Sequence, residues 1–164
     1  HRDLHSFPTR RSSDLQPGTP EEPKGHYIFD KPEPLWNFGH GKSYTMFDYV
    51  DCALSDTLLA ASDTLKVSVM IKNTGRCDGK EVVQLYVRDK VSTVATPIQQ
   101  LKAFQKVLGK SGESQCVELS LPIAELALYN AKMEEVVEPG DFEIQIGAAS
   151  DDIRFKKTIT INGK

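Results

Sequence analysis

The chain of 164 residues has few cysteines and no long apolar run. Its three cysteines, Cys52, Cys77 and Cys116, are odd in number and irregularly spaced. This spacing indicates neither a disulfide framework nor a paired zinc-ligand motif. We therefore expect the three cysteines to behave as small apolar side chains near strands. The apolar runs span only a few residues, whereas a membrane-crossing helix needs about 20. No apolar stretch typical of a signal peptide is visible, so localisation stays open.

The composition also lacks an excess of positive charge. Lysine and arginine total 20 against 23 acidic residues, for a formal net charge of -3. A nucleic-acid-binding surface is normally basic, so we expect no nucleic-acid partner. The four histidines have no neighbouring ligand residues at metal-binding spacing, and we expect no metal and no cofactor. Of the carboxylate pairs, Glu21-Glu22 and Glu134-Glu135 are interpreted as solvated charges, and Asp151-Asp152 as part of a surface turn.

Residues 1–15 do not resemble the start of a fold. HRDLHSFPTRRSSDL has no sustained period of 2 or 3.6 and is rich in arginine and serine, which suits disorder. All fifteen positions are similar to the conceptual translation of a common sequencing adapter. We therefore expect this stretch to be an artefact and exclude it from fold reasoning.

Residues 16–46 are expected to form an extended linker. Five of the nine prolines fall between residues 16 and 34, and proline favours extended backbone in itself and in its predecessor. Between these prolines, Tyr27-Ile28-Phe29 is an apolar patch that a free linker would not need. We expect that patch to dock on a neighbouring surface.

Aromatic side chains are dense at the end of the linker, in LWNFGHGKSYTMFDY from residue 35 to residue 49. Large rings bury apolar area while tryptophan and tyrosine keep a polar group, so these residues suit anchoring. His40 lies between two glycines, and its expected role is hydrogen bonding at a domain junction; a contribution to a neighbouring sugar site is the alternative. The candidate contacts to another domain or to a substrate entrance are Trp36, Phe38, His40 and Tyr44. The lone G-x-G there is too weak to indicate nucleotide binding.

From Phe47 onward, apolar and polar residues alternate between turn signals. Leu65, Val67, Val69 and Ile71 would share one face of a strand that ends at an N-T-G turn. Similar patterns recur to the end of the chain, with a short helical turn as an option for residues 122–128. About seven or eight short strands without intervening helices predict an all-β fold, a fibronectin type III-like (immunoglobulin-like) antiparallel β-sandwich over residues 47–164.

Several collinear motifs resemble the C-terminal part of family 3 glycoside hydrolases, the β-glucosidase group. The motifs are PLWNFGHGKSYTMFDY (34–49), KNTG with DG (72–79), EVVQLYVR (81–88), LKAFQK (101–106), PG (139–140) and GAASDD (147–152). The resemblance covers roughly residues 27–162. Lys42 stands where the family often has an apolar residue, and Trp36-Asn37 where an aromatic-proline pair is common.

The resemblance implies a parent enzyme with a catalytic barrel and a second α/β domain ahead of this module. Such enzymes hydrolyse O-glycosyl bonds with retention, using an aspartate nucleophile and a glutamate acid/base about 5–5.5 Å apart. The nucleophile's motif has no counterpart in this sequence, and the acid/base comes from the second domain. We therefore expect this chain not to be an enzyme by itself, and no catalytic residue is assigned to it.

Two hypotheses for its function follow. The first is a non-catalytic accessory module that stabilises and packs against the catalytic domains of the parent, which would be its intramolecular partner, with carbohydrate nearby. The alternative is a free-standing module that binds carbohydrate or protein. Members of the family are often secreted or periplasmic, and any export signal would lie upstream of this sequence.

Overall fold

The computed structural model describes residues 34–94 and 96–162. The chain divides after Trp36, and residues 37–164 form a compact unit of their own. Pro34, Leu35 and Trp36 are the only described residues of the preceding unit. The adapter-like residues 1–15 and the Tyr27-Ile28-Phe29 patch lie outside the described residues, so the predictions made for them stay predictions.

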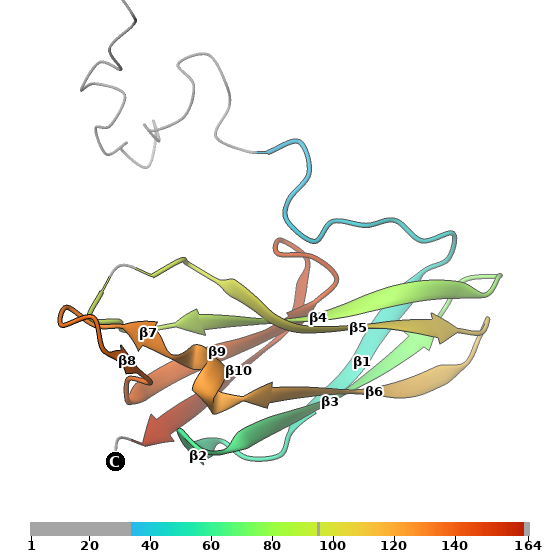
Figure 1. Ribbon diagram of the computed structural model, residues 1–164. Coiled ribbons are helices and arrows are strands. Elements are labelled where there is room, and N and C mark those ends of the chain that lie inside the picture. The colour runs from blue at the N-terminus through green and yellow to red at the C-terminus, as the bar shows by residue number, and fades with distance from the viewer. Residues whose placement is uncertain (1–33, 95, 163–164) are drawn as a thin grey trace, which may run out of the picture. The chain divides into compact units, whose positions relative to one another are not determined.

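Two sheets stack face to face in the compact unit (Figure 1). The three-stranded sheet has the order β1 (Phe47–Leu54), β3 (Thr64–Asn73), β6 (Ser114–Pro122). The five-stranded sheet has the order β2 (Leu58–Ala60), β10 (Ile153–Asn162), β9 (Gly140–Gly147), β4 (Gly79–Asp89), β5 (Gln100–Gly109). A 3₁₀ helix, η2 (Ile123–Leu126), and a small hairpin of β7 (Leu128–Tyr129) and β8 (Glu135–Val136) complete the described elements. The predicted all-β sandwich of seven or eight strands is confirmed.

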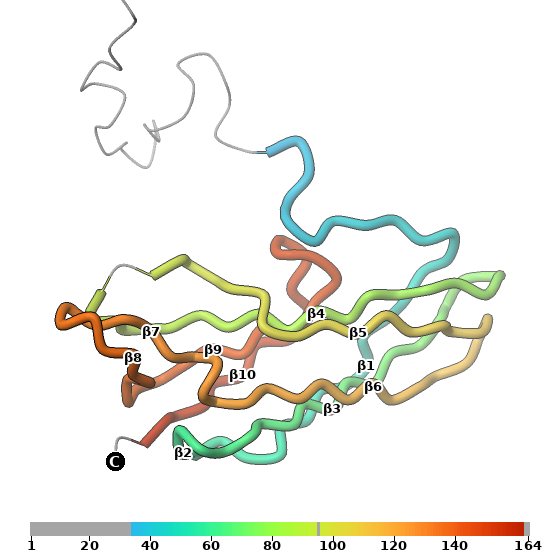
Figure 2. The backbone as a smooth tube through the Cα atoms, in the orientation of Figure 1, coloured from blue at the N-terminus to red at the C-terminus, as the bar shows by residue number. Residues whose placement is uncertain are grey.

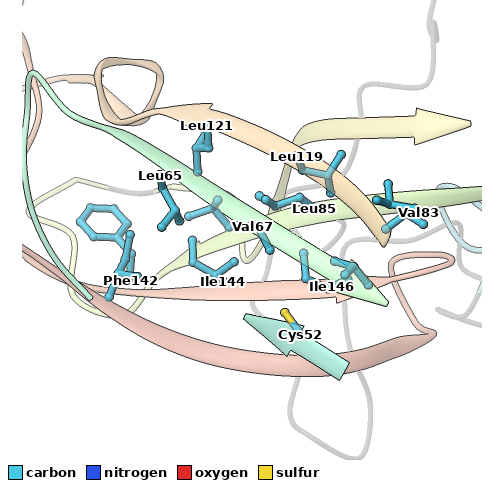
Figure 3. Packing of buried hydrophobic residues seen from close by; sticks show 14 of the residues in the cluster. Cys52, Leu65, Val67, Val83, Leu85, Leu119, Leu121, Phe142, Ile144 and Ile146 are labelled. Carbon is cyan, nitrogen blue, oxygen red and sulfur yellow. The ribbon is translucent and has the colours of Figure 1, made fainter. Parts of the chain in front are cut away.

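The core lies between the sheets and comes from alternating positions of each strand. In β3, Leu65, Val67, Val69 and Ile71 are all at most 1% exposed, as the sequence pattern predicts. Figure 3 shows Leu65 and Val67 of β3 among core side chains of both sheets. Burial of branched apolar side chains from two facing sheets is the main stabilising contribution in such a sandwich. The surrounding core residues include Leu119 and Leu121 of the same sheet and, from the facing sheet, Val83, Leu85, Phe142, Ile144 and Ile146.

One pairing departs from the predicted antiparallel arrangement. β2 pairs in parallel with β10, so that Leu58 lies opposite Thr160 and Ala60 opposite Asn162. β2 is only three residues long, which is too short for its alternation to be recognised in the sequence. The other ladders of the described residues are antiparallel.

The cysteines differ in environment. Cys52 is 5% exposed in the core, and burial, more than the neighbouring charges, raises the pKa of its thiol. Cys77 and Cys116 are exposed, so the expectation of small apolar side chains near strands describes Cys52 best. All three are free thiols. Among the described residues, no helix is long and apolar enough to cross a membrane.

Candidate functional site

The crossing segment, residues 37–46, runs from the turn between β9 and β10 to the start of β1 (Figure 2). At its beginning, the Asn37 side-chain amide donates to Asp151 Oδ2 at 2.6 Å. The backbone N–H of Ser150 donates to the carbonyl of Phe38 at 2.9 Å. These bonds attach the segment to a turn more than a hundred positions away in the sequence.

Two large polar side chains of β4 are buried beneath the crossing segment. Gln84 and Tyr86 are 4% and 1% exposed. The Gln84 amide donates to the carbonyl of Gly39 at 3.0 Å and also to that of Ala148, and its Oε1 accepts from the Tyr86 hydroxyl at 2.5 Å. Burial raises the pKa of Tyr86, which keeps its hydroxyl a donor. A buried network of this kind stabilises one arrangement because each unpaired member would be costly.

The approach of Gly39 to this network requires glycine. Its φ of +80° lies in the left-handed region, where a side chain is strained. A Cβ there would overlap Gln84 Oε1 and the Tyr86 hydroxyl. Next to it, the rings of Phe38 and Tyr86 meet edge to face, with centroids 6.5 Å apart.

Asn73 fixes the other end of the crossing segment. This buried side chain of β3 accepts from the Thr45 hydroxyl at 2.7 Å and from the backbone N–H of Gly75 at 3.0 Å. Its amide donates to the carbonyls of Cys77 and Gly109, both at 2.9 Å. One side chain thus joins the crossing segment, the β3–β4 turn and the end of β5.

A cavity of about 650 Å³ lies between the crossing segment, the start of β1, β4, β5, the β9–β10 turn and the start of β10. Its volume is within the range of about 300–1,000 Å³ that small-molecule sites occupy. Side chains from all of these elements contribute to its lining, among them Phe38, His40, Tyr49, Glu81, Phe104 and Arg154.

Four polar or charged side chains form a cluster in the cavity wall. The Tyr49 hydroxyl donates to Glu81 Oε1 at 3.2 Å. Arg154 pairs with Asp152 through two contacts, Nε–Oδ1 at 2.6 Å and Nη2–Oδ2 at 2.9 Å, and its guanidinium lies 5.8 Å from the centre of the Tyr49 ring. Desolvation, and to a lesser degree the charge of Asp152, raises the pKa of Glu81. Burial, then the charge of Glu81, raises the pKa of Tyr49 well above its ordinary value.

The four residues predicted as contacts are in different situations. Trp36 is 65% exposed and belongs to the preceding unit. Phe38 and His40 line the cavity, and Tyr44 is 99% exposed and does not line it. His40 bonds through its backbone, whose N–H donates to Asn37 O at 3.1 Å. The assignment of all four to a contact with another domain stays a proposal.

The sequence analysis missed most of the buried polar groups. Gln84 and Tyr86 lie on the face of β4 opposite Val83 and Leu85, and this alternation does not reveal that the crossing segment covers them. The available signal for burial was the type of these two side chains: both are uncharged, and one is aromatic, at alternate positions of that face. Asp151-Asp152 does lie in the predicted turn before β10, where Asp152 donates its N–H to Ala149 O. Within the described residues, no group of three or more histidine, cysteine or acidic side chains could hold a metal ion.

Comparison with known proteins supports one family. The family model named fibronectin type III-like domain matches residues 81–150. A β-xylosidase of Formosa agariphila is 43% identical over 143 residues, which are 86% of this chain and 19% of the relative. Thermostable β-glucosidase B of Acetivibrio thermocellus is 42% identical over 131 residues, covering 79% of this chain and 17% of the relative.

Solved structures agree. The β-glucosidase of Listeria innocua in complex with glucose superposes with a TM-score of 0.76 at 33% identity, covering 92% of this chain and 21% of that one. The chain thus spans about a fifth of the length of the relatives it matches, and their catalytic domains lie outside the matched part. By sequence and by fold, the chain belongs with the fibronectin type III-like modules of the family 3 glycoside hydrolases.

Proposed function

We propose that this chain is a non-catalytic accessory module that packs against the catalytic domains of a parent glycoside hydrolase. Its relatives include β-glucosidases and β-xylosidases about five times the matched length, so the rest of such a chain is available as an intramolecular partner. The parent's activity would be that of a β-glucosidase-like retaining enzyme, and its substrate would be selected in those other domains.

The observation that carries the proposal is the exposure of large apolar side chains on the crossing segment. Phe38 is 67%, Met46 68% and Tyr44 99% exposed. Exposed apolar side chains close together in the sequence are typical of an interaction surface. The segment itself is held rigidly by Gln84 and Asn73, so a partner would meet a surface that needs little ordering.

Trp36 and His40 extend the same proposal. Trp36 directly precedes the crossing segment and is exposed within its own unit, and the His40 side chain is exposed beside Gly39. Carbohydrate bound in the neighbouring domains would lie near the module if this surface borders the substrate entrance.

Complementation in trans tests the proposal. The Acetivibrio thermocellus relative would be expressed without the region that matches this chain, and the chain would be added as a separate polypeptide. We expect the chain to bind the truncated enzyme and raise its thermal stability. Tyr44→Ser should weaken this binding at least about fivefold, or roughly 1 kcal/mol, because a central interface tyrosine commonly contributes that much or more.

Val91→Ser is the matched control. Val91 is 82% exposed, follows β4 at the end remote from the crossing segment, and does not line the cavity. This substitution should leave binding unchanged. Equal binding by the unsubstituted chain and by Tyr44→Ser, or no binding at all, would count against docking through this segment.

A further inference from the structure

The cavity beside the crossing segment has rigid walls. The Gln84–Gly39, Ser150–Phe38 and Thr45–Asn73 hydrogen bonds fix the segment that forms one side of it. The opposite side consists of paired strands β4 and β5. A site whose walls are already ordered loses little conformational entropy when a ligand enters.

The charges of the cavity lining balance. Three cationic side chains (Lys42, Lys80, Arg154) and three carboxylates (Asp48, Glu81, Asp152) line it besides His40. Arg154 is paired with Asp152, so the lining as a whole favours neither a cation nor an anion. The same groups present both hydrogen-bond donors and acceptors, which suits a neutral ligand with many hydroxyl groups.

Glu81 shows that a purely apolar occupant would fit poorly. Its partly buried carboxylate accepts from the Tyr49 hydroxyl and lies in a wall whose guanidinium is engaged by Asp152. Covering such a carboxylate with apolar side chains removes its water without replacing the hydrogen bonds, which is costly. A hydroxyl donor would replace them.

Aromatic rings are available at the same cavity. Phe38 and Phe104 line it from opposite elements and are 67% and 65% exposed. The C–H-rich face of a pyranose ring can cover such a side chain and remove apolar surface from water, while the hydroxyls at its edge stay free for hydrogen bonds.

From these features we infer that the cavity is a binding site for a neutral saccharide unit, held by hydrogen bonds to Glu81 and the Arg154–Asp152 pair and by contact with Phe38 and Phe104. The site shares Phe38, His40 and Met46 with the docking surface proposed above, whereas Tyr44 does not line the cavity, so different substitutions test the two proposals. It belongs to the β-sandwich and requires no residue of a catalytic domain.

A titration of the ¹⁵N-labelled chain with methyl β-glucoside, methyl β-xyloside and cellobiose tests the inference. We expect dissociation constants of about 1–10 mM, as for a small polar ligand with few contacts. Amide shifts should change in residues 38–43, 80–84 and 148–154. No change at about 50 mM sugar, or changes confined to other surfaces, would overturn the inference.

Two substitutions localise the site. Phe104→Ser changes an exposed side chain of β5, and Glu81→Gln keeps the shape of the carboxylate but replaces one acceptor oxygen with a donor. Each should weaken binding at least about fivefold while the amide spectrum stays that of the folded chain. Glu118→Gln, on an exposed position of β6 in the other sheet, is the control and should bind as the unsubstituted chain does.

The two proposals can fail separately. If sugar binding is unaffected by both cavity substitutions, the cavity is not the site, whatever the complementation experiment shows. If the truncated enzyme blocks sugar binding and protects the cavity amides from exchange, docking covers the cavity through the side chains that both surfaces share, and the titration of the free chain alone tests the saccharide site.

Discussion

Replacing Gly39 with alanine tests how the crossing segment is held on the sandwich. The left-handed φ of +80° costs an alanine about 1–2 kcal/mol, before any contact is considered. The new Cβ would also overlap Gln84 Oε1 and the Tyr86 hydroxyl. The segment must therefore lift, which gives up the Gln84–Gly39 and Ser150–Phe38 hydrogen bonds, each worth about 0.5–1.5 kcal/mol. We expect Gly39→Ala to lower the free energy of unfolding by about 2–5 kcal/mol.

Gly41→Ala supplies a control two residues away. Nothing lies within 4 Å of a Cβ at that position, and Gly41 is not among the residues with positive φ. Its effect should stay within about 0.5 kcal/mol. Urea denaturation monitored by far-UV circular dichroism would measure the free energy of unfolding of both variants. Hydrogen exchange of the Ser150 amide would show whether the segment has lifted. Equal stability of the two variants, with Ser150 still protected, would refute the proposed role of Gly39.

Three further changes test other parts of the fold. Leu121→Ala, at a position 0% exposed, should cost about 2–5 kcal/mol in urea denaturation; a loss below about 1 kcal/mol would mean that the core collapses around the gap. Asn73→Ala removes four hydrogen bonds and should cost about 2–4 kcal/mol in urea denaturation; a loss below about 1 kcal/mol would show that these bonds do not stabilise the fold. Burial raises the pKa of Glu81, so the folded chain favours the protonated carboxyl. This contribution to the free energy of unfolding is fully present below about pH 4.5 and is lost as the pH rises through the folded-state pKa. The unfolding free energy of the chain relative to Glu81→Gln should therefore fall as the pH rises above about 4.5, and parallel pH profiles would exclude this effect.

The sequence predicted the core better than the site. Strict alternation from Leu65 to Ile71 defines one buried face without any knowledge of the partner strands, because a strand places alternate side chains on opposite sides. The 3₁₀ turn at Ile123–Leu126 also falls within the range where a helical turn was an option.

The buried polar residues could not be predicted because their partners are distant in sequence. Gln84 is covered by Gly39 and Ala148, which are 45 and 64 positions away, and nothing local distinguishes it from a solvated strand residue. Asn73 lies at the turn that the sequence predicts and accepts from the Gly75 N–H there, but its amide also reaches Gly109, 36 positions away. Only the assembled sheets bring these groups together, so the cavity that they help to form has no sequence signature of its own.

The parallel pairing of β2 with β10 affects when this module can fold during synthesis. It joins residues 58–60 to residues 160–162, about a hundred positions later, and β10 also pairs with β9. β10 is therefore an inner strand of its sheet, although it is the last described strand to leave the ribosome. Until it emerges, β9 has an unpaired edge and the core lacks Ile159 and Ile161, both buried. A ribosome that stops before β10 would release a chain with an open sheet edge, and such a chain is prone to aggregation and proteolysis. A folded module therefore indicates that translation has passed residue 162.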